Sequence, residues 1–370
     1  MSDAWSHDEV IYPELGRILS ESQGERNEEI AYALAICAGY AYAEVKGGAD
    51  KVTLRKRLAR VGLQDNTCKP IELSVDAMFI DSTAFVVRAC EGKVAILCYR
   101  GTEIADLTDW LTDIDTEPET YSFPQAPDRR NWRVHSGFYR STRATWDDVM
   151  AELASAGPEA LYITGHSLGG AMAAMAGVML RKDQDPRHRQ VRDALKAVYT
   201  YGQPMIGNVE FARECQADPF LRDNVIRHVH RNDIVPHLPP VATGPFAHFG
   251  TEFRYLNDPP GLESPSGYWR RNASARQAGM IDFALTPWEF VARRIPMAGS
   301  LVARWRPIGA KIEAVADRVE KAADTLHVPF GRPPSFVCYS IEDHAPHHYI
   351  AKLATPGVLS EFERERTSVS

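Results

Sequence analysis

The stretch LYITGHSLGGAMAAMAG, residues 161–177, joins a short apolar run to an alanine-rich run through a glycine-rich turn. The pattern Gly165-x-Ser167-x-Gly169 is typical of a strained strand-to-helix turn that lifts a serine hydroxyl clear of a sheet. Glycine leaves room there, because a Cβ would crowd the neighbouring strand or helix. A helix that merely packs tightly through small residues is the structural alternative. The stretch therefore predicts a strand, a helix and a candidate nucleophile, Ser167.

Apolar runs on both sides of this stretch alternate between strand-like and helix-like patterns. We expect strands over residues 84–88, 94–99, 132–135, 161–164, 195–201, 225–230 and 336–341, and helices over residues 28–44, 138–154, 168–180, 209–217 and 349–353. Alternating strands and helices form a largely parallel sheet with helices on its faces. The sequence therefore predicts an α/β fold with a mostly parallel central sheet, in which residues 1–370 form a single domain with one insertion.

The composition is that of an ordinary globular protein. Of the 370 residues, 44% are hydrophobic and 25% are charged, so the core can be large enough to need no disulfide or metal. The formal net charge of −7 provides no basic footprint for nucleic acid, and we expect no nucleic-acid partner. The six cysteines are scattered without a CxxC pair, which is typical of reduced thiols.

The N-terminal residues show no basic start followed by an apolar run, so we expect no signal peptide. No apolar run of about 18 residues indicates a membrane span. These observations predict a cytoplasmic protein, with leaderless secretion as the alternative.

A serine hydroxyl is a weak nucleophile, so it needs a base within hydrogen-bond reach and a third group that orients the base. Asp233 directly follows the predicted strand 225–230, where a carboxylate can orient an imidazole at the carboxyl edge of the sheet. Asp223 is a rival, but it precedes that strand and so lies at the wrong end. A turn-capping role is the structural alternative for Asp233.

The candidate bases are the histidines that follow this acid. They are His237, His248, His327, His344, His347 and His348. His344 follows a predicted strand and an aspartate, and Ser167, Asp233 and His344 have the chain order of an α/β-hydrolase triad. Other serine hydrolase folds use different orders. A metal site at His344, His347 and His348 lacks a completing carboxylate or cysteine pattern, so we expect no metal and no other cofactor.

Seven segments resemble, in order, the class 3 lipase family, the fungal-type lipases with an α/β-hydrolase fold. They are CYRGTE (98–103), RVHSGF (133–138), GHSLGG (165–170), YGQPMIGN (201–208), NDIVPHLPP (232–240), HFGTEFRY (248–255) and IEDHAPHHYI (341–350). Together they place the resemblance over roughly residues 28–256 and 335–353. The family's Asp-His-x-x-x-x-Tyr pattern falls on Asp343, His344 and Tyr349. The resemblance implies catalytic roles for Ser167, Asp233 and His344.

An acyl-transfer enzyme also needs donors where the oxyanion forms. The backbone N–H of Leu168, the residue after the nucleophile, is one expected donor. The resemblance implies that the N–H of Thr102 is the second, although residues 100–102 also fit a simple turn at a strand end. We expect His166 to be a packing residue beside the nucleophile.

Residues 103–118 form a lid-like amphipathic segment. Its apolar residues fall on one helical face: Ile104, Leu107, Trp110, Leu111 and Ile114. The corresponding position in the family holds a lid helix or the segment that replaces it. A surface helix packed on the core is the alternative.

Residues 259–334 read as a helical insertion or cap, longer than we expect from the fungal lipases. Between residues 292 and 311 this insertion carries Arg293, Arg294, Arg304, Arg306 and Lys311 without an acid. A basic amphipathic segment with tryptophan and phenylalanine suits an anionic membrane surface. A helical cap over the mouth of the active site, with solvated arginines, is the alternative, and both roles are compatible.

The sequence thus favours a serine carboxylester hydrolase, a lipase or esterase, that cleaves acyl esters of lipids through an acyl-enzyme. A phospholipase A acting at anionic membranes would use the same residues and differ in head-group recognition. A non-catalytic ligand-binding or scaffold protein on a hydrolase fold is a more distant alternative. It predicts a missing triad member, whereas all three candidates are present.

Overall fold

The computed structural model describes residues 10–42, 52–75, 80–101, 119–121, 131–239, 246–255, 269–272, 340–355, 358 and 362. The chain divides into two compact units, one of residues 1–276 and 342–370 and the other of residues 277–341. The second unit contains only two described residues, so the helices and strands below all belong to the first. Within the described ranges, no helix is long and apolar enough to cross a membrane.

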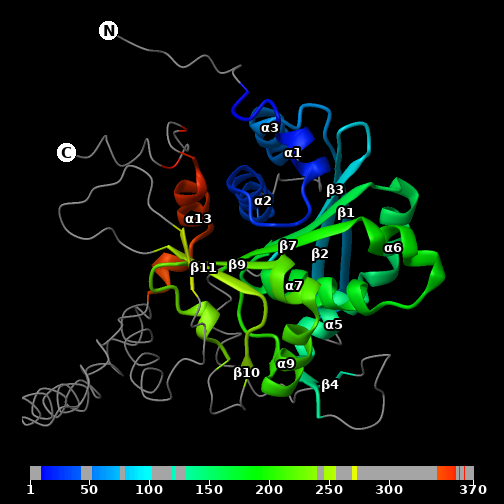
Figure 1. Ribbon diagram of the computed structural model, residues 1–370, viewed down its shortest axis with the longest axis vertical. Coiled ribbons are helices and arrows are strands. Elements are labelled where there is room, and N and C mark those ends of the chain that lie inside the picture. Colours follow the sequence, from blue (N-terminus) through cyan, green and yellow to red (C-terminus); the bar gives the residue numbers. More distant parts are fainter. Residues whose placement is uncertain are drawn as a thin grey trace, which may run out of the picture. The chain divides into compact units, whose positions relative to one another are not determined.

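Among the described residues, an eight-stranded sheet forms the centre of the first unit (Figure 1). Its strands, in spatial order, are β1 (Thr67–Val75), β2 (Ile80–Ala89), β3 (Val94–Tyr99), β6 (Ala160–His166), β7 (Leu195–Tyr201), β9 (Val225–His230), β11 (Thr251–Tyr255) and β12 (Trp269–Arg271). The five strands from β3 to β11 run parallel, and antiparallel strands flank them on both sides. The predicted α/β fold with a mostly parallel sheet is confirmed.

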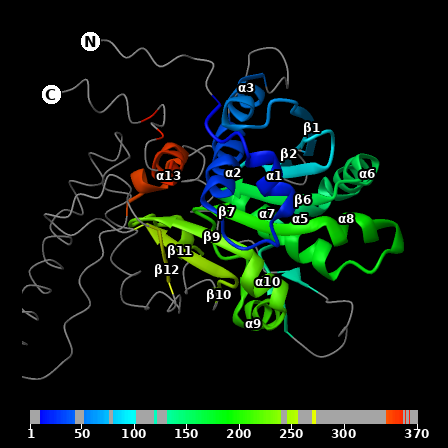
Figure 2. The same cartoon turned by 45° about the horizontal axis from the view of Figure 1, so that its top comes forward.

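Helices cover both faces of this sheet (Figure 2). One face carries α1 (Leu15–Glu21), α2 (Glu28–Tyr40) and α13 (Pro346–Leu353), and α3 (Val52–Val61) packs on α2. The other face carries α5 (Ser136–Ala144), α6 (Trp146–Ala156), α7 (Leu168–Lys182), α8 (Arg189–Ala194) and α10 (Pro219–Asn224). Nearby, α9 (Val209–Ala217) packs against a small second sheet.

The small sheet has the order β10-β8-β5-β4, and its strands are β10 (Phe246–Ala247), β8 (Gly207–Asn208), β5 (Arg133–Val134) and β4 (Glu119–Thr120). Three short 3₁₀ helices, η2 (Pro186–His188), η3 (Val235–His237) and η6 (Glu342–His344), complete the described elements used below.

Two expectations about local structure were wrong. The helix expected over residues 138–154 is two helices, because Thr145 between α5 and α6 has φ −94° and ψ −1°. Threonine competes for backbone hydrogen bonds and so favours helix ends over helix interiors. Residues 269–271, expected within the helical insertion, form strand β12, where Trp269 pairs with Tyr255.

The lid-like segment 103–118 and the rest of the insertion 259–334 lie outside the described residues, so both stay predictions. The described cysteines form no disulfide, as expected; they are Cys37, Cys68, Cys90, Cys98 and Cys215.

The first unit contains several histidines that are neutral at physiological pH. Burial lowers the pKa of six of them: to about 3 for His166 and His230, to about 4 for His135 and His237, and well below the ordinary value for His228 and His248. Each is uncharged in the folded protein at neutral pH. The unfolded chain, in contrast, protonates its histidines near pH ~6.5.

We therefore expect the protein to lose stability steeply as the pH falls from about 6.5 to about 4. In this window the unfolded chain binds protons that the folded protein does not, so each buried histidine lowers the free energy of unfolding by up to about 1.4 kcal/mol per pH unit. Urea unfolding midpoints across this window measure the slope. Replacing buried His228 by Gln should flatten the slope, whereas exposed His347→Gln should not. A midpoint independent of pH would contradict the expectation.

Candidate active site

Ser167 stands at the turn between β6 and α7. Every residue of β6 is buried, and α7 begins at Leu168, directly after the serine. Ser167 has φ 59° and ψ −128°, a left-handed conformation that costs an L-residue on the order of 1 kcal/mol. A Cβ on Gly165 would lie 2.2 Å from the carbonyl oxygen of Gly169, and one on Gly169 would lie 2.3 Å from that of Tyr99. Only glycine fits at these two positions, so both glycines are required for the tight turn that holds Ser167.

The Ser167 hydroxyl is buried and unusually placed. Within the described part of the chain, its Oγ has no hydrogen-bond partner, and neither does Nε2 of His344. Buried polar atoms normally find partners, so each such atom requires an explanation. Hydrogen bonds between catalytic groups are often long before substrate binds. A nucleophile and a base that bond to each other only in the substrate complex would therefore explain both atoms.

Asp233 and His344 form a buried pair at the carboxyl ends of the parallel strands. Nδ1 of His344 lies 2.8 Å from Oδ2 of Asp233, and both side chains are fully buried. Asp233 follows β9, and its Oδ1 accepts a hydrogen bond of 2.9 Å from the N–H of Val235. Burial opposes ionisation, but His344 and the hydrogen bonds together hold the pKa of Asp233 below its ordinary value. The carboxylate is thus charged and can orient the imidazole.

Two residues beside this pair were not assigned a role from the sequence. The hydroxyl of Tyr349 donates to Oδ2 of Asp233 at 2.5 Å and accepts from the N–H of His230 at 3.1 Å. Gly202, with φ 59°, backs the pair, because a Cβ there would lie 2.7 Å from Nδ1 of His344 and 2.8 Å from Oδ2 of Asp233. Both segments were noted in the sequence, but only the fold shows what they contact.

The segment after Asp233 is held by a buried charged network. The carbonyl of Pro236 accepts a hydrogen bond of 2.7 Å from Nε2 of His248. Arg227 on β9 is paired in register with Glu252 on β11, and their side chains meet at 3.2 Å. Burial opposes the charge on Glu252, yet Arg227 and Arg254 hold its pKa at about 2. The loop that carries Asp233 is therefore bound by His248, which lies near this buried ion pair.

The expected oxyanion donors are only partly described. Leu168 is the first residue of α7, where a backbone N–H has no partner within the helix. This N–H lies at the positive end of the helix dipole. Thr102 lies outside the described residues, so its role stays a prediction. Its neighbour Gly101 packs against the turn between β6 and α7, since a Cβ there would lie 3.2 Å from the N of Gly169.

The other candidate bases and the other candidate acid have surroundings that differ from those of His344 and Asp233. The rings of His347 and His348 are tilted against each other with centroids 4.1 Å apart, and His348 stacks on His230. His237 lies in η3, next to the acid, and His327 lies outside the described residues. The rival acid Asp223 is exposed and pairs with Arg222 at 2.7 Å. No group of three or more metal-binding side chains occurs among the residues that the structure describes.

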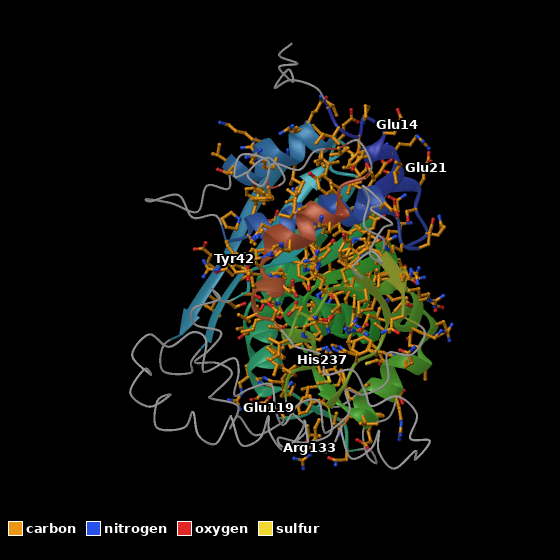
Figure 3. The ribbon with its side chains drawn as sticks, turned by 90° about the vertical axis from the view of Figure 1, so that its left-hand side faces the viewer. Glu14, Glu21, Tyr42, Glu119, Arg133 and His237 are labelled. Atoms are coloured by element: carbon orange, nitrogen blue, oxygen red, sulfur yellow. The ribbon has the colours of Figure 1, made fainter. Side chains whose placement is uncertain are left out.

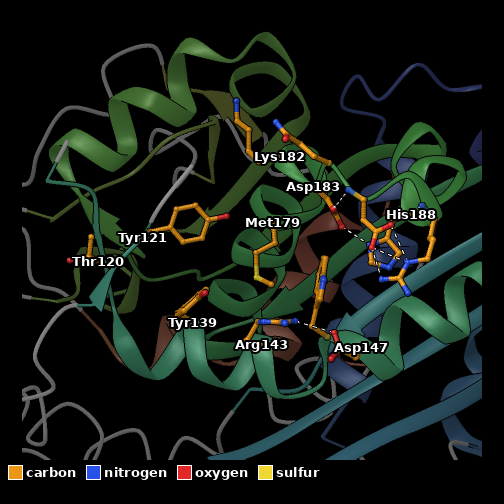
Figure 4. A pocket seen from close by; sticks show the side chains of 13 residues that line it. Thr120, Tyr121, Tyr139, Arg143, Asp147, Met179, Lys182, Asp183 and His188 are labelled. Carbon is orange, nitrogen blue, oxygen red and sulfur yellow. Dashed lines mark hydrogen bonds and ion pairs between the residues drawn. The ribbon is translucent and has the colours of Figure 1, made fainter. Parts of the chain in front are cut away.

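A pocket with a volume of about 480 Å³ lies between α5, α6 and the end of α7 (Figure 4). Tyr121, Tyr139 and Met179 contribute apolar surface, while charged side chains surround them. Arg143 and Asp147 in this pocket pair with each other at 3.1 Å. None of the three candidate catalytic residues lines it, so this pocket is separate from the Asp233–His344 pair.

Comparisons with known proteins find similarity to lipases. Residues 96–243 match the family described as Lipase (class 3). A lipase from Rhizopus niveus is 34% identical over 182 residues, which cover 48% of this chain and 42% of that protein. Toxin TseL from Vibrio cholerae serotype O1 is 27% identical over 224 residues, or 58% of this chain and 31% of that protein.

Among solved structures, lipase II from Rhizopus niveus matches with a TM-score of 0.50 and 26% identity, covering 68% of this chain and 85% of that one. The chain spans less than half the length of the two curated relatives named above. The resemblance expected from the seven segments is confirmed. The matched residues 96–243 include Ser167 and Asp233 but end before His344, which the fold brings back to the site.

Proposed function

Because residues 96–243 match the family described as Lipase (class 3), we propose that the protein is a serine carboxylester hydrolase that cleaves acyl esters of lipids. One observation carries the proposal. A buried Asp233–His344 pair, joined at 2.8 Å, accompanies a serine held in a strained turn at the start of a helix. This combination supplies nucleophile, base and orienting acid, as acyl transfer requires.

In the proposed mechanism, Oγ of Ser167 attacks the acyl carbonyl while Nε2 of His344 takes its proton. Asp233 holds the imidazole through Nδ1 and stabilises the imidazolium that forms. The N–H of Leu168 donates to the developing oxyanion, with Thr102 as the proposed second donor. The imidazolium then protonates the leaving alcohol, and water attacks the acyl-enzyme with His344 again as base.

Ester turnover and covalent labelling test this proposal. We expect the wild-type protein to hydrolyse p-nitrophenyl esters, with a rate that depends on acyl-chain length. A fluorophosphonate should stop the reaction, and mass spectrometry should find its adduct on the peptide that contains Ser167. Turnover with the adduct on another residue would contradict the assignment of the nucleophile. A protein without turnover on any ester would support the ligand-binding or scaffold alternative instead.

A phospholipase A is the second candidate, and the five cations between residues 292 and 311 favour it. Cations near a membrane attract anionic lipid at about 1 kcal/mol each. Under this candidate, anionic phospholipid vesicles should be hydrolysed faster than triacylglycerol emulsions. Co-sedimentation with anionic vesicles should weaken as salt is raised. Absence of binding even at low salt would remove the membrane contact.

A further inference from the structure

Tyr42 and His166 form a hydrogen-bonded pair next to the candidate triad. Tyr42, labelled in Figure 3, lies just beyond the C-terminal end of α2, and His166 directly precedes Ser167. The Tyr42 hydroxyl lies 3.1 Å from Nδ1 of His166. On the other side of the ring, Nε2 of His166 lies 2.7 Å from the carbonyl oxygen of His344. The pair thus joins the N-terminal helical layer to the loop that carries the base.

These contacts fix where the protons lie. A carbonyl oxygen can only accept, so Nε2 of His166 must donate to His344. Nδ1 of the neutral ring is then an acceptor, and the Tyr42 hydroxyl has two acceptors, this Nδ1 and the His166 carbonyl oxygen at 3.3 Å. Burial lowers the pKa of His166 to about 3, so the ring is neutral when the enzyme works. Neutrality matters because the ring centroids of His166 and His344 are 4.5 Å apart. A charge on His166 would oppose the imidazolium that His344 becomes.

The same pair also touches the segment that leads to the second oxyanion donor. A Cβ on Gly101 would lie 2.3 Å from the Tyr42 hydroxyl and 2.6 Å from the carbonyl oxygen of His166. The backbone before Thr102 is therefore packed directly on the pair. Three segments far apart in the sequence, those of Gly101, Ser167 and His344, share this single point of support.

We propose that Tyr42 and His166 are positioning residues that hold the base and the oxyanion segment in register with Ser167. The inference rests on the proposed hydrolase function and extends it to a residue in the N-terminal layer, outside the matched residues 96–243. Tyr42 acts only through His166 and the backbone it supports. Its loss should therefore affect the chemical step more than substrate binding.

The test compares kcat and KM of Tyr42→Phe with those of the wild type on one p-nitrophenyl ester. We expect kcat to fall about tenfold, because small displacements of catalytic groups are costly, while KM stays within about twofold. Tyr162→Phe is the matched control. Tyr162 lies on the same strand as His166, and its buried hydroxyl donates to the Leu19 carbonyl at 2.8 Å, away from the triad. Thermal unfolding of both variants shows whether a loss reflects folding.

Two substitutions of His166 sharpen the test. His166→Gln can keep a donor toward the His344 carbonyl, whereas His166→Phe keeps a ring without one. We expect the Gln variant to retain roughly tenfold more kcat than the Phe variant. If the wild type is active, an unchanged kcat in Tyr42→Phe or an equal loss of kcat in Tyr162→Phe would overturn the inference. Either result would leave the proposed function standing. A wild-type protein without turnover would overturn the proposed function and the inference with it.

Discussion

Ser167→Ala is expected to lower kcat for ester hydrolysis by about 10⁶-fold, since triad serines in other hydrolases cost about that much when removed. The substitution removes one atom, Oγ, which has no hydrogen-bond partner among the described residues. No buried partner is left unsatisfied, so the free energy of unfolding should change by less than about 1 kcal/mol. The loss should therefore be one of chemistry, with the fold and substrate binding retained.

Initial rates on p-nitrophenyl esters, together with urea unfolding, measure both quantities. Ser155→Ala is a suitable control, because Ser155 is an exposed serine on α6 whose hydroxyl bonds to a backbone carbonyl of the same helix. It should keep wild-type turnover, which would show that a serine-to-alanine substitution does not by itself abolish activity. Equal turnover in Ser167→Ala and the wild type would remove Ser167 as nucleophile, and with it the proposed mechanism.

The strand and helix around Ser167 could be predicted because their causes are local. Alanine and glycine on α7 allow close packing on the sheet, and a Cβ on Gly177 would already lie 2.6 Å from Val198. Strands β7 and β9 have the expected bounds, since runs rich in β-branched and aromatic residues mark strands. Asp233 could be placed at the carboxyl edge for the same reason, because it directly follows such a run.

Edge strands were harder to predict from the pattern. Strand β1 contains Lys69, Pro70 and Glu72, which count against a strand. Proline is tolerated at the edge of a sheet, where its missing N–H leaves no ladder bond unmade, and β1 is the edge strand. Strand β12 lies at the opposite edge and follows a proline-rich segment that suggests a loop. Position in the sheet, which the local pattern does not contain, decides both cases.

The supporting contacts of the site could not be predicted, because they depend on tertiary packing. Tyr349 reaches Asp233 across 116 positions, and Tyr42 reaches His166 across 124. Tyr42 has no local pattern that distinguishes it from a core aromatic residue, and the family pattern that includes Tyr349 does not say which side chain it contacts. His166 was expected only to pack, and its bond to the His344 carbonyl requires that the turn before α13 reach the end of β6. Sequence patterns indicated the candidate catalytic residues, while the fold shows which side chains contact them.

Asp233→Asn is expected to lower kcat by about 10⁴-fold with little change in fold, because it reverses the tautomer of the base. The N–H of Val235 points at Oδ1, so the asparagine oxygen should take that position and its NH₂ the position of Oδ2. That NH₂ then faces Nδ1 of His344, which must become an acceptor and carry its proton on Nε2. A histidine protonated on Nε2 cannot take the proton of Ser167.

Steady-state rates of Asp233→Asn and of Asp223→Asn provide the comparison. Asp223 is the rival acid, exposed and paired with Arg222, so its variant should keep wild-type kcat. The buried variant should also bind substrate with nearly unchanged KM, since Asp233 is fully buried behind His344. If Asp233→Asn kept its activity, the 2.8 Å pair would be structural, and another acid would have to orient the base. Asp343 precedes His344 directly, and the same measurement on Asp343→Asn would then show whether it does so.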